Sequence, residues 1–239
     1  MSTHRTRFVT AGSAALLTAG LVGCTTEAAP RSAPSSAPAA VVSLPSGDGE
    51  TVLDPGPYVF PVIDSDGWPS MLPVVSVPPG YAATDDAAGV TVGDDDVDAD
   101  ARQLRIWSID SIYSHPCDTS RTTLTVGPTA ADLADALAAQ PMRDGTDPVP
   151  VTIDGHDGYY VELSVPDDID IATCPAAKFF SWPGRWQQAP GQVDMLWIVD
   201  VDGQRLVFDA WTLPGVDPQQ TTQLQNMVTT ATFIATDDL

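Results

Sequence analysis

Two long apolar runs joined by an Asp-Gly pair are the feature that most constrains the fold of this chain. The first run spans Asp194 to Val201 and the second spans Gln204 to Thr212, with Asp202-Gly203 between them. An Asp-Gly pair readily takes the positive φ angles of the tight turn that matches the twist of two antiparallel strands. The sequence therefore predicts a long β-hairpin at this place in the chain.

Other apolar runs predict further strands of the same antiparallel kind. Val151 to Ile153 and Tyr159 to Val165 lie on either side of a second Asp-Gly pair, and Leu72 to Val77 ends at a Pro-Pro-Gly turn. Leu104 to Tyr113 has apolar residues on both of its alternating faces. Because a strand of that kind is covered on both faces, we expect helices to pack against the sheet.

Two helices are predicted to cover the sheet. The first follows Thr129, which forms a weak capping box with Asp132, and its apolar residues recur on one face. The second follows Asp217 and has Pro218 at its first helical position. Because β-branched residues weaken the end of this helix, we expect an extended stretch around Phe233. The predicted fold class is α+β, a mostly antiparallel β-sheet with two or more covering helices.

The N-terminus has the pattern of a secretion signal. Two arginines precede an apolar run from Phe8 to Val22, which is too short to span a bilayer as a helix. The run closes at Leu21-Val22-Gly23-Cys24, which resembles the lipobox of bacterial lipoproteins. The resemblance implies that residues 1–23 are removed as a signal peptide and that Cys24 carries diacylglycerol. It places the chain at the extracytoplasmic face of the cell membrane.

The segment that follows the signal is rich in Ala, Pro and Ser. Residues 24–49 include Pro30, Pro34 and Pro38 and show no apolar period. A segment of this composition buries too little apolar surface to fold, so we expect a disordered tether over 24–49. The remaining residues, 50–239, are enough for one domain with a sizeable core, and no second linker of this composition interrupts them.

The cysteines indicate a disulfide. Once the lipid takes Cys24, Cys117 and Cys174 remain as an even pair. In the oxidising space outside the membrane, such a pair predicts a disulfide bond. The alternative is a metal site that adds His115 and His156 to the two cysteines, but the chain lacks the closely spaced ligand pairs that zinc sites use. We therefore predict a disulfide, and neither a metal ion nor a cofactor.

The chain is strongly acidic, with 32 acidic and 10 basic residues and a formal net charge of -22. A field of this sign repels phosphate backbones and anionic lipids. We therefore expect no nucleic-acid partner, and the attachment to the membrane has to come from the lipid on Cys24.

The acidic run from Asp94 to Asp100 is a candidate Ca²⁺ site. Registered as an EF-type loop from Asp96, it has Ala101 where Gly is required and Trp107 where the bidentate Glu belongs. A solvated loop is therefore the expectation for this run. A loose, weak Ca²⁺ site is the alternative.

The residue pattern of a hydrolase is missing from the sequence. The predicted mature chain has two histidines, His115 and His156, and each lies beside turn residues. Nucleophilic catalysis needs a base next to the nucleophile, and the chain has no Gly-x-Ser-x-Gly elbow. We therefore predict no catalytic residue and no enzyme activity, and an envelope hydrolase is the alternative.

The candidate for recognition is the segment Trp182-Pro183-Gly184-Arg185-Trp186-Gln187-Gln188. Two indoles and a guanidinium on a bent loop offer stacking surfaces and a hydrogen-bonding fork to a sugar or a peptide. The residues predicted to contact a ligand are Trp182, Arg185, Trp186 and Gln187. The alternative is that the tryptophans belong to the core, because aromatic side chains bury large areas.

Several of these motifs follow one another in an order that a known family shares. They are Val77-Pro78-Pro79-Gly80-Tyr81, the helix after Thr129, the run Tyr159-Tyr160-Val161-Glu162-Leu163, the long hairpin and the C-terminal helix. This order resembles small actinobacterial surface lipoproteins with a PsbP-like domain, and residues 187–207 are similar to a C-terminal module of such lipoproteins. The resemblance covers about residues 74–233. It implies an α/β/α sandwich that serves as a binding or assembly module, and the acidic run and the cysteine pair are not part of it.

Together, these patterns predict a lipid-anchored, non-enzymatic module of the cell envelope that binds a small ligand or an envelope protein. Besides the hydrolase, the alternative is an accessory or sensor subunit of a transport or signalling system. A cavity lined by Trp182, Arg185 and Trp186 would favour ligand binding, whereas a flat surface there would favour assembly with a protein.

Overall fold

The computed structural model of the chain describes residues 41–47, 49–64, 69–93, 98–118 and 122–239. The predicted signal peptide, Cys24 and most of the predicted tether lie outside these residues, as does the first part of the acidic run, Asp94 to Val97. All described residues belong to one compact unit. No helix among them is long and apolar enough to cross a membrane.

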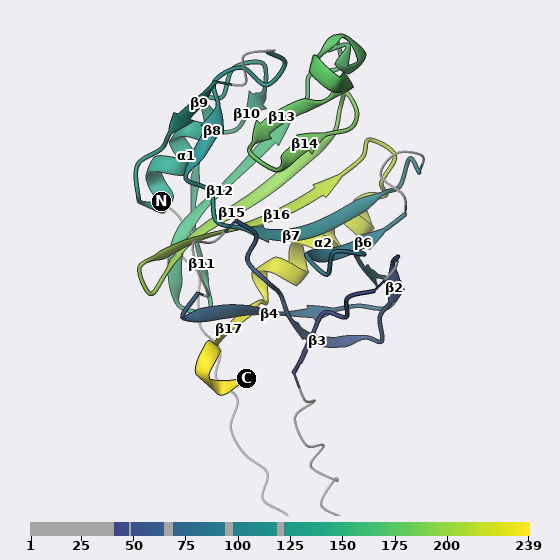
Figure 1. Cartoon of the computed structure of the whole chain (residues 1–239), viewed down its shortest axis with the longest axis vertical. Coiled ribbons are helices and arrows are strands. Elements are labelled where there is room, and N and C mark those ends of the chain that lie inside the picture. Colours follow the sequence, from purple (N-terminus) through teal and green to yellow (C-terminus); the bar gives the residue numbers. More distant parts are fainter. Residues whose placement is uncertain (1–40, 48, 65–68, 94–97, 119–121) are drawn as a thin grey trace, which may run out of the picture. The chain divides into compact units, whose positions relative to one another are not determined.

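The predicted hairpin lies at the centre of a nine-stranded antiparallel sheet (Figure 1). Its strands β15 (Val193–Val201) and β16 (Gln204–Thr212) pair along their full length, and Asp202 and Gly203 take positive φ angles in the turn. The other strands are β2 (Thr51–Val52), β5 (Ala82–Ala83), β6 (Gly89–Val92), β7 (Arg102–Trp107), β10 (Asp144–Gly145), β11 (Val149–Ile153) and β12 (His156–Ser164). The strand order is β10-β12-β15-β16-β7-β6-β5-β2, and β11 also pairs with β12.

Both predicted helices are present and begin where their caps predict. α1 (Ala130–Ala138) follows Thr129, and the side chains of Thr129 and Asp132 form the capping box. α2 (Pro218–Thr229) follows Asp217, whose side chain accepts a hydrogen bond from a backbone N–H in the first turn of the helix. The chain is then extended again in β17 (Thr232–Ala235), as predicted, before a last 3₁₀ turn, η3 (Thr236–Asp238).

The main sheet has an apolar core on each face, because successive residues of a strand point to opposite sides. On one face, Leu196 of β15 packs in a cluster with Leu133 of α1. On the other face, Met195 packs in a cluster with Leu224 of α2. That second cluster also includes residues from a four-stranded sheet made of β1 (Val42–Ser43), β3 (Gly56–Val59), β4 (Met71–Val77) and β17. The predicted helix, sheet, helix order is therefore present (Figure 1).

The chain enters the fold earlier than the predicted tether allows. Val42–Ser43 forms β1, which pairs in parallel with β3, and Leu44 is buried in the core. Residues 42–44, which the prediction placed in the tether, are therefore part of the fold. A strand of two residues whose partner lies elsewhere in the chain leaves no periodic pattern in the local sequence, which is why composition alone missed it.

The strand predicted over Leu104 to Tyr113 is two strands in the structure. β7 ends at Trp107, and β8 (Ser111–Tyr113) pairs instead with β9 (Thr123–Thr125). At the end of β7, the backbone of Ile63 bonds to the chain on either side of Trp107. Beyond this contact the chain leaves the main sheet. The alternation of apolar residues gives no sign of the break, because residues before and after the break are buried.

The predicted disulfide joins Cys117 and Cys174, whose Cα atoms are 4.8 Å apart at a sequence separation of 57. Cys174 lies between two short 3₁₀ helices, η1 (Ile171–Thr173) and η2 (Pro175–Ala177), and packs with Phe179 in a small cluster. The bond ties this segment to the chain that follows β8. Across the described residues, no group of three or more His, Cys, Asp or Glu side chains is placed to hold a metal ion.

Candidate functional site

The segment predicted to serve recognition forms a short β-hairpin on the α1 side of the main sheet. β13 (Phe179–Trp182) pairs antiparallel with β14 (Arg185–Gln187), and Pro183 and Gly184 form the turn. Pro followed by Gly, with a φ of +82° at Gly184, meets the requirement of a type II turn. A Cβ at Gly184 would lie 3.3 Å from the ring of Trp107, so the turn packs directly on the end of β7.

Trp182 belongs to the core. Its side chain is 1% exposed, and its ring packs edge to face against Trp107 with the ring centroids 5.8 Å apart. No ring face is left for a ligand. Trp182 is therefore a core residue and not a recognition residue. Gln187 is buried too, and its Nε2 donates to Ser181 Oγ and Asp194 Oδ2, each at 2.9 Å. Both residues hold the site together and do not present a surface to a ligand.

Of the four residues predicted to contact a ligand, three are buried and Trp186 is partly exposed. Lys178 Nζ lies 3.5 Å from the centroid of its ring, which is a cation–π contact. The ring also packs against Phe180, with centroids 6.5 Å apart. Trp186 is therefore held at the rim of the hairpin with part of its ring accessible.

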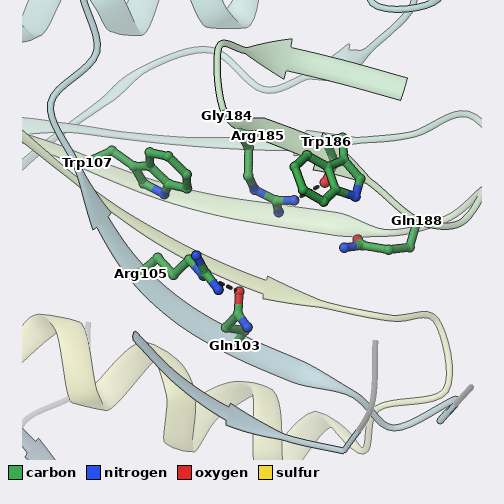
Figure 2. Close-up of a pocket in the computed structure, with 7 residues that line it drawn as sticks. All are labelled: Gln103, Arg105, Trp107, Gly184, Arg185, Trp186 and Gln188. Carbon is green, nitrogen blue, oxygen red and sulfur yellow. Dashed lines mark hydrogen bonds between the residues drawn. The ribbon is translucent and has the colours of Figure 1, made fainter. Parts of the chain in front are cut away.

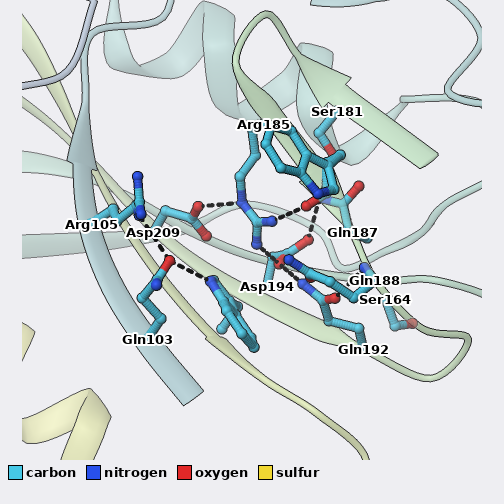
Figure 3. Close-up of polar contacts among 12 residues, drawn as sticks. Gln103, Arg105, Ser164, Ser181, Arg185, Gln187, Gln188, Gln192, Asp194 and Asp209 are labelled. Atoms are coloured by element: carbon cyan, nitrogen blue, oxygen red, sulfur yellow. Dashed lines mark hydrogen bonds and ion pairs between the residues drawn. The ribbon is translucent and has the colours of Figure 1, made fainter. Parts of the chain in front are cut away.

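Four buried charges lie beneath this hairpin, and Figure 3 shows three of them, Arg185, Asp194 and Asp209. Asp194 accepts from Arg143 Nη2 at 2.5 Å and from Arg185 Nη2 at 2.6 Å. Asp209 accepts from Arg185 Nε at 2.6 Å. Two glutamine side chains give Asp194 two further hydrogen bonds. The two guanidiniums balance the two carboxylates, which is the condition under which charges are found in protein interiors.

The two carboxylates have pKa values shifted in opposite directions. Burial raises the pKa of Asp194, but Arg185 and Arg143 outweigh burial and hold the pKa below its usual range. Burial raises the pKa of Asp209 as well, and there Arg185 lowers it by less, while Asp194 raises it further. Asp209 Oδ1 has no hydrogen-bond partner in the described part of the chain. Asp194 is therefore ionised, and Asp209 is the carboxylate that takes up a proton more readily.

The register of the central hairpin brings the two carboxylates to one face. Leu196 lies opposite Asp209, and Asp194 lies opposite Trp211, so both aspartates point toward β14. Neither aspartate, nor Arg143, was among the residues predicted for the site from the sequence. A charged residue inside a buried apolar run is the signal that identifies the aspartates, whereas Arg143, in the loop after α1, carries no such signal.

A cavity of about 70 Å³ lies between β14 and β7, and we call it the arginine cavity (Figure 2). Two of the predicted ligand-binding residues, Arg185 and Trp186, line it. A second cavity of about 270 Å³, the adjoining cavity, shares the side chains of Gln103 and Arg105 with it. The full lining of the arginine cavity is Gln103, Arg105, Trp107, Gly184, Arg185, Trp186 and Gln188.

Arg105 lies at the border between the two cavities. Its Nε donates to Gln103 Oε1 at 2.8 Å, and its Nη1 donates to Asp86 Oδ2 at 3.0 Å. Gln103 Oε1 also accepts from Trp211 Nε1 at 3.2 Å, so this amide is held from two sides. Gly89 pairs with Arg105 across β6 and β7, and a Cβ there would come within 2.7 Å of Arg105 Cγ. The direction of the Arg105 side chain is thus set by its neighbours.

The histidines lie away from these cavities. His115 is exposed, and its Nδ1 lies 3.3 Å from Ser114 Oγ. His156, expected in a turn, is the first residue of β12, because the second Asp-Gly turn closes directly before it, and its ring packs 5.0 Å from that of Phe233. A third cavity of about 690 Å³ lies between the first turn of α1 and the β11–β12 hairpin. Neither histidine lines any of these three cavities.

Comparisons with solved structures find chains of similar fold, two of which are described here. The scan against protein-family models found no match, and neither did the search of curated proteins. The chain is similar to LpqN, involved in cell envelope biogenesis of Mycobacterium tuberculosis, at 12% identity and a TM-score of 0.39, over 75% of this chain and 90% of that one. It is also similar to cyanobacterial PsbP (CyanoP) from Synechocystis sp. PCC 6803, at 13% identity and a TM-score of 0.29, over 72% of this chain and 95% of that one. At these values neither likeness indicates a function, which has to come from the residues of the chain itself.

Proposed function

We propose that this chain is a lipid-anchored lipoprotein of the cell envelope whose extracytoplasmic domain binds a small polar ligand in the arginine cavity. The observation that carries the proposal is how the cavity is held. Arg185 is fixed from beneath by two buried carboxylates, and Arg105 is held through its Nε by the buried side chain of Gln103. Polar groups that are already in place lose little conformational entropy when a ligand binds.

The proposed envelope location rests on the sequence. The lipobox at Cys24 supports a lipid anchor, and the resemblance to actinobacterial surface lipoproteins supports the same location. An anchor of two or more acyl chains is enough for stable attachment. The net charge of -22 supports attachment by lipid rather than by electrostatic docking on anionic headgroups.

The proposed function is binding without catalysis. The charged groups among the described residues that line the arginine cavity are guanidiniums, which offer donors and no acceptor and so do not serve as general bases. Among the residues that the structure describes, those that line this cavity include no hydroxyl, thiol or imidazole that could attack a substrate. The hydrolase alternative would depend on Ser114 and His115, which lie outside this cavity.

The anchor is tested at Cys24. In cells fed labelled palmitate, Cys24→Ser is expected to abolish labelling, because the thiol to which the lipid is attached is gone. The variant should be released or stay as an uncleaved precursor. A variant that lacks both Cys117 and Cys174 is the control and should keep the label. Label on Cys24→Ser would show that the lipobox interpretation is wrong.

The binding site is tested by NMR on the mature, lipidated chain in detergent micelles. The indole proton–nitrogen resonances, assigned by Trp→Phe substitutions, report on each tryptophan separately. Titration with the small-molecule fraction of an envelope extract is expected to shift Trp107 and Trp186, which line the cavity. Trp197 packs on the other face of the sheet and should not move. Unchanged Trp107 and Trp186 resonances would contradict the proposal.

A further inference from the structure

The charged side chains that line the arginine cavity are hydrogen-bond donors, while Gln103 and Gln188 add amide oxygens that can accept. Both of its charged lining residues, Arg105 and Arg185, are arginines, although the chain has 32 acidic and only 10 basic residues. No carboxylate is among the described residues that line it. A group that fits this cavity therefore has to bring acceptor atoms.

One of the lining donors is buried and unpaired. Trp107 is 3% exposed, and its Nε1 has no hydrogen-bond partner within the part of the chain that the structure describes. A buried N–H that has lost its water and gained no partner is costly. In Figure 2 this nitrogen lies on the edge of the ring that faces Arg105. An acceptor atom placed between the indole and the guanidinium would satisfy the Trp107 N–H.

Arg105 has donors to spare for the same acceptor. Its hydrogen bonds to Gln103 and Asp86 use Nε and one bond of Nη1, and Nη2 has no partner among the described residues. The Asp86 side chain is 48% exposed, and an ion pair at such a site contributes little. A guanidinium binds a carboxylate through two parallel hydrogen bonds, a geometry that no neutral acceptor matches. A ligand carboxylate can therefore compete with Asp86 for Arg105.

We propose that the ligand of the arginine cavity carries a carboxylate, which accepts from Trp107 Nε1 and from the guanidinium of Arg105. This inference rests on the proposed function, since it names the chemistry of the ligand at that site. A volume of about 70 Å³ is several times the roughly 10–15 Å³ that one water needs, so a carboxylate with its first carbon atoms fits. The uncharged rest of the ligand extends past Arg105 into the adjoining cavity, whose lining includes the hydroxyls of Thr84 and Thr91 and the carboxylates of Glu50 and Asp85.

The negative charge of the whole chain does not oppose this assignment. At physiological ionic strength, exposed charges farther away than about 8 Å are largely screened. Beneath the cavity, Asp194 and Asp209 are balanced by Arg143 and Arg185. Arg105 is the charge at the border of the cavity, with Asp86 as its partner, and the further carboxylates of Glu50 and Asp85 line the adjoining cavity and not the arginine cavity.

The experiment uses defined probes on the mature, lipidated chain. The Trp107 indole resonance is followed during titration with acetate, N-acetylglycine and glucuronate, and in parallel with their neutral counterparts acetamide, N-acetylglycinamide and glucose. The carboxylates are expected to give a saturable downfield shift of the Trp107 proton, and the neutral counterparts none at the same concentrations. Tighter binding of glucuronate would indicate a sugar acid, and tighter binding of N-acetylglycine the carboxyl end of a peptide.

Two variants should change the affinity in opposite directions. Arg105→Gln keeps an amide donor but loses the charge, and it is expected to weaken carboxylate binding about tenfold or more, which is about 1.4 kcal/mol. Asp86→Asn removes the competing carboxylate and should tighten binding. Both side chains are partly exposed, so both variants are expected to fold, and an unchanged Trp197 resonance checks this.

The outcomes separate this inference from the function on which it rests. Equal Trp107 shifts with acetate and acetamide would overturn the carboxylate assignment and leave the binding site in place. The carboxylate assignment is equally wrong if an envelope extract shifts Trp107 but no carboxylate does, or if Arg105→Gln binds the carboxylates as tightly as the parent chain. If neither the extract nor any probe moves Trp107, both the carboxylate assignment and the proposed function are wrong.

Discussion

Replacing Arg143 with methionine is expected to lower the free energy of unfolding by about 3–5 kcal/mol. The side chains of Arg143 and Asp194 are both 0% exposed, and the variant leaves two buried carboxylates with one guanidinium. Removing one partner of a buried ion pair costs this much because the remaining charge has lost both its partner and its water. Chemical denaturation followed by circular dichroism measures the change.

Two further variants show whether the cost comes from the unpaired charge. Arg143→Met combined with Asp194→Leu leaves Arg185 and Asp209 as a balanced pair, and it should recover much of the stability that Arg143→Met alone loses. Arg105→Met is the matched surface control, because its partner Asp86 is half-exposed, and it should cost less than about 1 kcal/mol. A similar loss in Arg143→Met and Arg105→Met would contradict the structural role of the buried network.

The same network makes the stability depend on pH in a direction that can be worked out. The pKa of Asp194 lies below its unfolded value of about 3.9, so Asp194 stabilises the fold above that value, and this contribution is lost as the pH falls through the folded pKa. The pKa of Asp209 is raised, so its protonation favours the folded state as the pH falls and opposes that loss. Arg143→Met removes one cause of the low pKa of Asp194, and the acid unfolding transition should move to higher pH.

The elements that the sequence predicted are those whose signals are local. The Asp202-Gly203 turn sets two strands by its own backbone preferences, and Thr129 with Asp132 sets the start of a helix within one turn. The break after Trp107 and the early strand at Val42 depend on partners far away in the chain, Ile63 and β3. No local pattern records which distant segment will supply a backbone partner, so these features were missed.

The residues of the candidate site also fall into those that the sequence indicates and those that only tertiary packing brings together. Arg185 and Trp186 stand out from the sequence as polar and aromatic residues on a bent loop, and both line the arginine cavity. Arg105 and Trp107 line it too, but on β7 they look like ordinary alternation in an apolar strand. Only the placement of β14 over that strand makes them part of a site. Sequence could therefore indicate half of the cavity, and the other half is a product of tertiary packing.

Replacing Trp182 with alanine is expected to cost on the order of 3–5 kcal/mol of the free energy of unfolding, as truncation of a large buried aromatic does. The side chain is 1% exposed and packs against Trp107 in the core beneath α1. Its loss would leave a cavity that rigid strands on both sides cannot fill. Differential scanning calorimetry and denaturant titration measure the change.

Trp186→Ala is the matched control, because the two tryptophans flank one turn and differ mainly in burial. The partly exposed ring of Trp186 contributes its contacts with Lys178 and Phe180, so we expect a loss of about 1 kcal/mol. The loss of ligand affinity should be larger in Trp186→Ala than in Trp182→Ala. Trp186→Ala removes part of the cavity wall from a folded protein. Trp182→Ala affects binding only through its contact with Trp107 and through the stability of the fold. Equal losses of stability in the two variants would mean that Trp182 is not the core residue that its burial indicates.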